Sequence, residues 1–174
     1  GRKMKLFHGT SAINAKRIEK SGFAEAKSNW KVTSKKGFIY LSTAYAPFYA
    51  MNANRNGYKL ALIKVSVDES CLFPDDDFLM RAMGKPVYTQ TELDEIELEN
   101  YQEHWIKSLE YMGNVAAYPD DIEIVGVTYF NGKNLLFRCD PSITPINYRI
   151  MGNYYKDLSE WLYQGKAIMN FKKF

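Results

Sequence analysis

The stretch that decides the fold is KLFHGTSAINAKRIEKSGF (5–23), and GFIYLSTAYAPFYAMNAN (37–54) follows it after a polar segment. The apolar residues at 4–8 predict a short strand, and the residues at 12–21 have the apolar spacing of a helix. The chain has only two histidines. One of them, His8, lies between the buried strand and the start of the helix, which raises the question of what an imidazole does there.

Small polar residues explain how the first helix starts and ends. Thr10 or Ser11 can cap its N-terminus, because their hydroxyl oxygens accept a hydrogen bond from a free backbone N–H of the first turn. The spacing places Ile13 and Ile18 on the inward face. Gly22 is expected to end the helix.

The second stretch repeats this order of a strand followed by a helix. Residues 37–42 are uniformly apolar, as in a strand that is buried on both faces. Ser42 and Thr43 can cap a helix over residues 44–54. The next segment, KLALIKVSV (59–67), alternates with a period of two and predicts another strand.

The middle of the chain predicts a loop and then a long helix. Residues 71–90 contain proline, glycine and three consecutive aspartates, which favours an irregular segment with one helical turn. A helix over residues 91–112 is expected, capped by Thr91 and ended by Gly113. Its inward stripe consists of Leu98, Tyr101, Trp105, Leu109 and Met112.

The last third predicts a hairpin and a final helix. Residues 122–139 form two apolar runs on either side of Asn131-Gly132, a dipeptide that favours a two-residue turn between antiparallel strands. Residues 154–165 are amphipathic with helical spacing. This mixture of helices and antiparallel strands predicts an α+β fold, and the length predicts a single domain over residues 1–174.

Composition excludes several classes of protein. The net charge of +3 is too small to indicate nucleic-acid binding by itself. The short basic clusters at 27–37 and 170–174 are interpreted as solvated. No apolar run is long enough to span a bilayer and no signal peptide precedes the first strand, so a cytoplasmic protein is expected.

Known site motifs are mostly absent from the sequence. There is no glycine-rich phosphate loop and no nucleophile elbow. The cysteines and histidines lack the paired spacing that most zinc sites show, so no metal site is predicted. They are scattered along the chain at Cys71, Cys139, His8 and His104. The cysteines are expected to be free thiols in a reducing compartment. His104 is interpreted as a boundary or solvent-facing residue.

His8 has two interpretations. It can be a core histidine whose ring is satisfied by a backbone carbonyl. Alternatively, it can belong to a binding site, because Gly9, Thr10 and Ser11 follow it and open the N-terminus of a helix, where backbone N–H groups are free.

Three short motifs support the interpretation of His8 as part of a binding site. They are FHGT (7–10), SGF (21–23) and GFIYLST (37–43). In this order, with an alanine-rich helix after the last motif, the chain resembles the ADP-ribosyltransferase superfamily. The resemblance covers residues 6–53, and residues 105–127 are loosely similar to the later part of small phage and bacterial members. It implies a split antiparallel β-sheet core in which two small sheets enclose NAD, with helices outside.

The resemblance also implies roles for individual residues. His8 would form a hydrogen bond with a ribose hydroxyl of NAD, and the backbone of Gly9 and Thr10 would lie close to the nicotinamide amide. Tyr40 would stack on the nicotinamide ring, and Ser42 would complete the NAD-binding set. NAD would be consumed as a substrate.

The superfamily usually has a third site residue, a glutamate late in the chain. Cleavage of the bond between nicotinamide and ribose builds positive charge on the ribose, which a nearby carboxylate stabilises. Glu123 is the first candidate for this carboxylate, and a solvent-facing strand residue is its alternative interpretation. Glu110 and Glu160 are weaker candidates. The three aspartates at 75–77 are expected to lie in a solvated loop.

The predicted function is therefore NAD-dependent ADP-ribosyl transfer to a macromolecular acceptor, a protein or a nucleic acid. Small members of this superfamily commonly act as toxins, phage effectors or anti-defence factors, and a phage protein would work in the host cytoplasm. Two alternatives stay open. One is an RNA 2′-phosphotransferase-like enzyme, and the other is a non-enzymatic module that binds a protein partner through its aromatic surface.

Overall fold

The computed structural model describes residues 1–23, 37–43, 46–53, 59–84 and 89–132, together with Glu160 and Tyr163. Strands and helices alternate irregularly along this part of the chain. In order they are β1 (Lys3–Ser11), α1 (Ala12–Ser21), β2 (Ile39–Ser42), α2 (Ala46–Ala53), β3 (Lys59–Asp68), the 3-10 helix η2 (Glu69–Cys71), β4 (Phe73–Pro74), α3 (Asp76–Met83), α4 (Gln90–Asp94), η3 (Leu98–His104), α5 (Trp105–Met112), β5 (Asn114–Ala117), η4 (Pro119–Asp121) and β6 (Ile122–Asn131).

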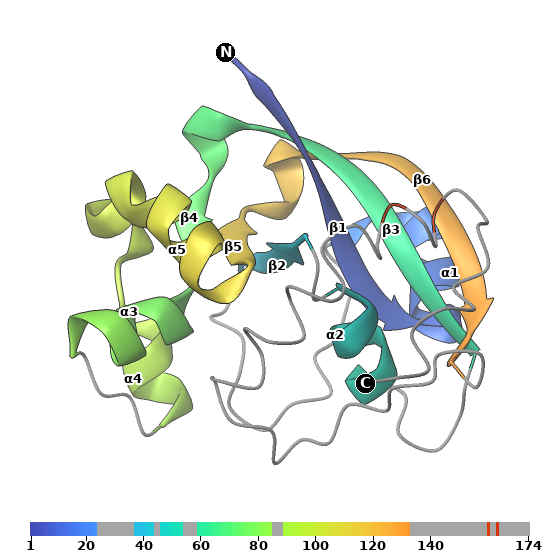
Figure 1. Cartoon of the computed structure of the whole chain (residues 1–174), viewed down its shortest axis with the longest axis horizontal. Coiled ribbons are helices and arrows are strands. Elements are labelled where there is room, and N and C mark those ends of the chain that lie inside the picture. The colour runs from blue at the N-terminus through green and yellow to red at the C-terminus, as the bar shows by residue number, and fades with distance from the viewer. Residues whose placement is uncertain are drawn as a thin grey trace.

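The strands form one six-stranded sheet in the order β4-β5-β2-β1-β3-β6, and every neighbouring pair is antiparallel. The α+β class that the sequence predicts is confirmed. In Figure 1 the long strands β1, β3 and β6 lie side by side, and the short strands β4 and β5 lie beside α5. The sheet therefore consists of a long-stranded half and a short-stranded half that meet between β1 and β2.

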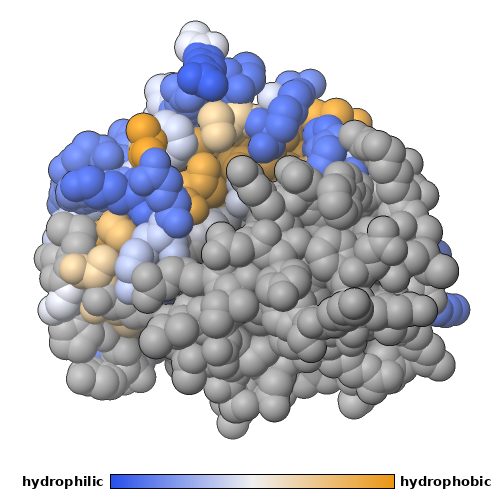
Figure 2. All heavy atoms as spheres, viewed as in Figure 1, coloured by the Kyte–Doolittle hydropathy of each residue, from blue (hydrophilic) through white to orange (hydrophobic). Residues whose placement is uncertain are grey.

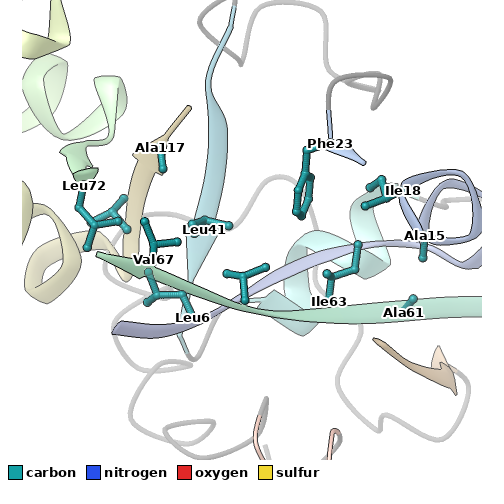
Figure 3. Packing of buried hydrophobic residues seen from close by; sticks show 12 residues of the cluster. Leu6, Ala15, Ile18, Phe23, Leu41, Ala61, Ile63, Val67, Leu72 and Ala117 are labelled. Atoms are coloured by element: carbon teal, nitrogen blue, oxygen red, sulfur yellow. The ribbon is translucent and has the colours of Figure 1, made fainter. Parts of the chain in front are cut away.

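The main core lies on one face of the sheet, under α1. Ala15 and Ile18 of this helix pack there with Phe23 and with side chains from the central strands (Figure 3). Leu6, Leu41 and Ile63 belong to the same cluster and are fully buried. Burial of this apolar surface is the main contribution that holds α1 on the sheet.

Strand β3 is buried at nearly every position, although its sequence alternates as a half-exposed strand would. Ala61, Ile63 and Val65 lie in the core under α1, while Leu62 packs on the opposite face with Ala46 of α2. Period-two alternation predicts a strand covered on one face only. Helices cover both faces here, and their position depends on residues elsewhere in the chain.

The first helix has the expected ends. The Ser11 side chain accepts a hydrogen bond from the backbone N–H of Asn14, at 3.2 Å, and Gly22 ends the helix with a φ of 80°. The prediction that Ile13 faces inward is wrong, because its side chain is 71% exposed. The buried face of α1 consists of Asn14, Ala15 and Ile18.

The middle of the chain differs from the predictions in two ways. Residues 71–90 contain the two-turn helix α3, not a loop with a single turn. The predicted long helix is broken into α4, η3 and α5, and Thr89 caps its first piece instead of Thr91. Leu93 and Leu98 are both buried. In one continuous helix, two residues five positions apart would point about 140° apart, so a break lets both reach the interior.

The last third is described in part. Strand β6 confirms the first run of the predicted hairpin and ends at Asn131. The second run of the hairpin, which includes Cys139, lies outside the described residues. So does the predicted C-terminal helix, except for Glu160 and Tyr163. Glu160 contacts Lys64 of β3, with Lys64 Nζ 3.0 Å from Glu160 Oε1, and the Tyr163 ring packs edge-on against Phe7.

Candidate functional site

The junction between the two halves of the sheet is narrow. Strand β1 pairs with β3 through nine residues, and β2 pairs with β5 through four. Between β1 and β2 one pair is formed, Phe7 with Ser42. His8 follows Phe7 in β1 and Tyr40 lies two residues before Ser42 in β2, so in this antiparallel arrangement both residues that the sequence singled out lie on the same side of the pair.

His8 is held by the backbone of the neighbouring strand. Its Nδ1 lies 2.8 Å from the carbonyl oxygen of Tyr40. A carbonyl oxygen can only accept a hydrogen bond, so Nδ1 carries the proton and Nε2 of the neutral ring is left as an acceptor. The imidazole and the Phe23 ring pack in a T-shaped arrangement, with centroids 5.3 Å apart and planes at 84°.

Burial lowers the pKa of His8 below its usual value, although the hydrogen bond to the Tyr40 carbonyl acts in the opposite direction. The charged imidazolium is disfavoured because it would lose its hydration among apolar side chains. At neutral pH the ring is therefore uncharged, with a lone pair on Nε2.

Tyr40 has a buried acidic partner. Its hydroxyl donates a hydrogen bond to Oδ1 of Asp76, at the start of α3. Its ring packs against a cluster of apolar residues that includes Phe38, Phe78 and Ala116. The structure thus brings Tyr40 and His8 together through a ring-to-backbone hydrogen bond, while their rings pack against different clusters.

Gly9 and Thr10 have clear structural roles. Helix α2 crosses β1 so closely at Gly9 that a Cβ there would lie 1.8 Å from the carbonyl oxygen of Ala46. Thr10 is buried, and its hydroxyl accepts a hydrogen bond from the side-chain amide of Asn14 at 2.9 Å. Ser42 is also buried, in β2 between Phe7 and β5.

Glu123 is not brought to His8 or Tyr40. It is exposed on β6 and pairs with Ser66 of β3. Strand β3 lies between β6 and β1, and His8 pairs with Ile63, which lies three residues before Ser66 in β3. Of the weaker candidates, Glu110 is exposed on α5, and Glu160 forms the ion pair with Lys64.

The acidic triplet is the main feature that sequence reasoning missed. Asp75 is 4% exposed and Asp76 is 1% exposed, so the expected solvated loop is wrong. Asp75 caps α3, because its Oδ1 accepts from the backbone N–H of Asp77 at 2.9 Å. The sequence signal was an aspartate followed by two acidic residues before an apolar segment, which is typical of a helix N-terminus.

Burial is the largest cause that raises the pKa of Asp75 well above its usual value, and the nearby charges of Asp77 and Asp76 act in the same direction. Hydrogen bonds from the backbone of Asp77 and from the side chain of Asn114 oppose this shift. The buried carboxyl group therefore holds its proton to a higher pH than an exposed aspartate does.

A polar network connects the start of α3 to three other elements. The backbone N–H of Asp75 donates to Ser108 Oγ of α5 at 2.9 Å, and that hydroxyl donates to the carbonyl of Asn114 at 2.8 Å. The side-chain amide of Asn114 donates to the hydroxyl of Tyr49 in α2. Buried polar groups that are fully paired in this way fix the relative positions of the elements that carry them.

Three carboxylates in the described part of the chain lie close enough to share a cation. Ligand oxygens of Asp75, Asp76 and Asp77 lie within 4.8 Å of one another. Two of them already have other roles, since Asp75 caps the helix and Asp76 accepts from Tyr40. The observed geometry is that of a capped helix N-terminus with a bonded tyrosine.

No protein-family model matches the chain, and no curated protein matches it. These two comparisons assign no family to the chain. Among the described residues, no helix is both long and apolar enough to cross a membrane. In the view of Figure 2, hydrophilic side chains cover much of the described surface, with separate hydrophobic areas between them.

Proposed function

We propose that this chain binds NAD at the junction of β1 and β2 and transfers its ADP-ribose to a macromolecular acceptor. The observation that carries the proposal is the geometry of the junction. One residue pair joins the halves of the sheet, and beside it the His8 ring of β1 is hydrogen-bonded to the backbone carbonyl of Tyr40 in β2. The sequence motifs imply two small sheets, whereas the described strands form one sheet whose two halves meet at this single pair.

The state of His8 suits the proposed role. With the proton fixed on Nδ1 by the Tyr40 carbonyl, Nε2 can accept a hydrogen bond from a ribose hydroxyl. The lowered pKa keeps this lone pair free of a proton at neutral pH. Tyr40 would supply its ring as a flat apolar surface for the nicotinamide.

The proposed reaction replaces one bond at C1′ of the ribose with another. The bond between the nicotinamide nitrogen and C1′ of the ribose breaks, and nicotinamide leaves with the bonding electron pair. A nucleophile of the acceptor forms a bond to C1′ and releases its proton to water. Positive charge develops on the ribose in the transition state, so a carboxylate close to it would lower the barrier.

Calorimetric titration with NAD tests the proposal. We expect the intact protein to bind NAD, and His8→Ala and Tyr40→Ala each to weaken binding by about tenfold or more, since each removes one hydrogen bond or one stacking surface. Tyr40→Phe, which keeps the ring, should bind more tightly than Tyr40→Ala.

His104→Ala is the matched control for His8, because His104 lies in η3 and pairs with Glu103. It should bind NAD as the intact protein does. Absence of binding by the intact protein would contradict the proposed function. Equal losses in the His8 and His104 variants would contradict the proposed site.

A further inference from the structure

The hydroxyl of Tyr40 lies against a carboxylate that is almost fully buried. Asp76 is 1% exposed, and its Oδ1 accepts the hydrogen bond from Tyr40. A buried carboxylate is costly unless donors satisfy it. The hydroxyl of the half-buried Tyr40 is one such donor, and the hydrogen bond ties the tyrosine side chain to the start of α3.

The start of α3, which carries Asp76, is held by contacts of the neighbouring residue Asp75. Asp75 caps α3, and the backbone N–H of Asp75 is bonded to Ser108 of α5. The Asp75 carboxyl group accepts a hydrogen bond from the side chain of Asn114, the first residue of β5, and Tyr40 pairs with Ala116 of the same strand. The start of α3 and strand β2, which carries Tyr40, thus both contact β5.

We infer that Asp76 is a positioning residue, which fixes the orientation of the Tyr40 ring at the proposed NAD site through its hydrogen bond to the tyrosine hydroxyl. The inference rests on the proposed function. Asp76 acts through Tyr40 and need not touch NAD. Side chains held by such partners keep a binding geometry that a freely rotating ring would lose.

A series of variants tests this role by NAD titration of the full chain. Asp76→Asn keeps an oxygen acceptor of the same shape, so its NAD affinity should stay within about threefold of the intact protein. Asp76→Ala removes the acceptor and should weaken binding by about tenfold. Tyr40→Phe combined with Asp76→Ala should bind no more weakly than Asp76→Ala alone, because both changes remove the same interaction.

Glu19→Ala is the matched control. Glu19 of α1 accepts a hydrogen bond from the hydroxyl of Tyr129, so this change breaks a second tyrosine–carboxylate pair in the long-stranded half of the sheet. Its NAD affinity should not change. Thermal unfolding of each variant shows whether a loss of NAD binding comes from loss of folding. If Asp76→Ala unfolds, the NAD affinity of Asp76→Asn still tests the role of the acceptor oxygen.

The outcomes separate the two proposals. Failure of the intact protein to bind NAD overturns the proposed function, and this inference with it. Binding by the intact protein that Asp76→Ala leaves unchanged overturns the positioning role alone. The positioning role is also overturned if the double variant binds NAD more weakly than Asp76→Ala by the full effect of Tyr40→Phe. Asp76 would then act by a route other than the hydroxyl of Tyr40.

Discussion

Gly9→Ala is expected to lower the free energy of unfolding by about 3 kcal/mol and the unfolding temperature by roughly 10 °C. The added Cβ would lie 1.8 Å from the carbonyl oxygen and 2.7 Å from the carbonyl carbon of Ala46, and 2.9 Å from the backbone nitrogen of Ala50. All three atoms belong to the backbone of α2, so no side-chain rotation relieves the contact. The helix has to move away from β1, which opens the packing of Phe7, Ala46 and Leu62.

Thermal and urea unfolding measure this effect. Gly84→Ala is the control, because a Cβ there meets nothing within 4 Å and only the left-handed backbone, with a φ of 66°, is strained. That strain alone should cost about 1 kcal/mol. If Gly9→Ala were no more destabilising than Gly84→Ala, the close approach of α2 to β1 would be wrong.

Asp75→Asn is expected to stabilise the protein at neutral and alkaline pH. Burial and two neighbouring carboxylates raise the pKa of Asp75 in the folded chain. Asparagine has the same shape, is always neutral, and is an equally good N-terminal cap. The variant therefore avoids the cost of placing a negative charge in this buried position.

The sign of the pH dependence follows from proton binding. Below the usual aspartate pKa of 3.8, Asp75 is protonated in both the folded and the unfolded chain, so the two proteins should have similar stability. As the pH rises from there toward the raised folded pKa, the unfolded chain releases its proton first, and wild-type stability falls by about 1.4 kcal/mol per pH unit.

Urea unfolding between pH 3.5 and 8 measures the difference between wild type and Asp75→Asn. Subtracting the two stabilities removes the contribution of His8, which both proteins share. The lowered pKa of His8 acts in the opposite direction, because its stabilising contribution is present above pH 6.5 and is lost as the pH falls. Asp120→Asn, at an exposed aspartate, is the control and should follow the wild type. A constant difference between Asp75→Asn and wild type over this range would show that Asp75 is not buried with a raised pKa.

Local signals in the sequence predicted most of the elements of the first half. Ser11 and Gly22 bound α1, and the apolar run before Ser42 forms β2, because caps and short apolar segments act over a few residues. The same reasoning placed His8 at the end of a strand over residues 4–8, but β1 continues through Gly9 and Thr10 to Ser11, and these residues pair with β3. This reasoning could not show that the Tyr40 carbonyl fixes the His8 tautomer, since 32 residues separate the two.

Reasoning from short patterns failed where distant residues decide burial. The aspartates at 75 and 76 are polar and consecutive, which indicates a solvated loop, yet both are buried because Ser108, Asn114 and Tyr40 supply hydrogen-bond partners from three other elements. Glu123 was chosen because it begins a strand. Its distance from His8 depends on the strand order, which places β3 between β6 and β1.

By itself the sequence determined the α+β class, the caps of α1 and the presence of a histidine and a tyrosine on two early strands, because these depend on periodicity and on contacts within one turn. The tertiary structure alone decided that β1 and β2 meet through one pair, that α2 lies against Gly9, and that Asp76 holds Tyr40. These contacts join residues far apart in the chain. Their energies come from burial and hydrogen-bond pairing that exist only after the strands are ordered in the sheet.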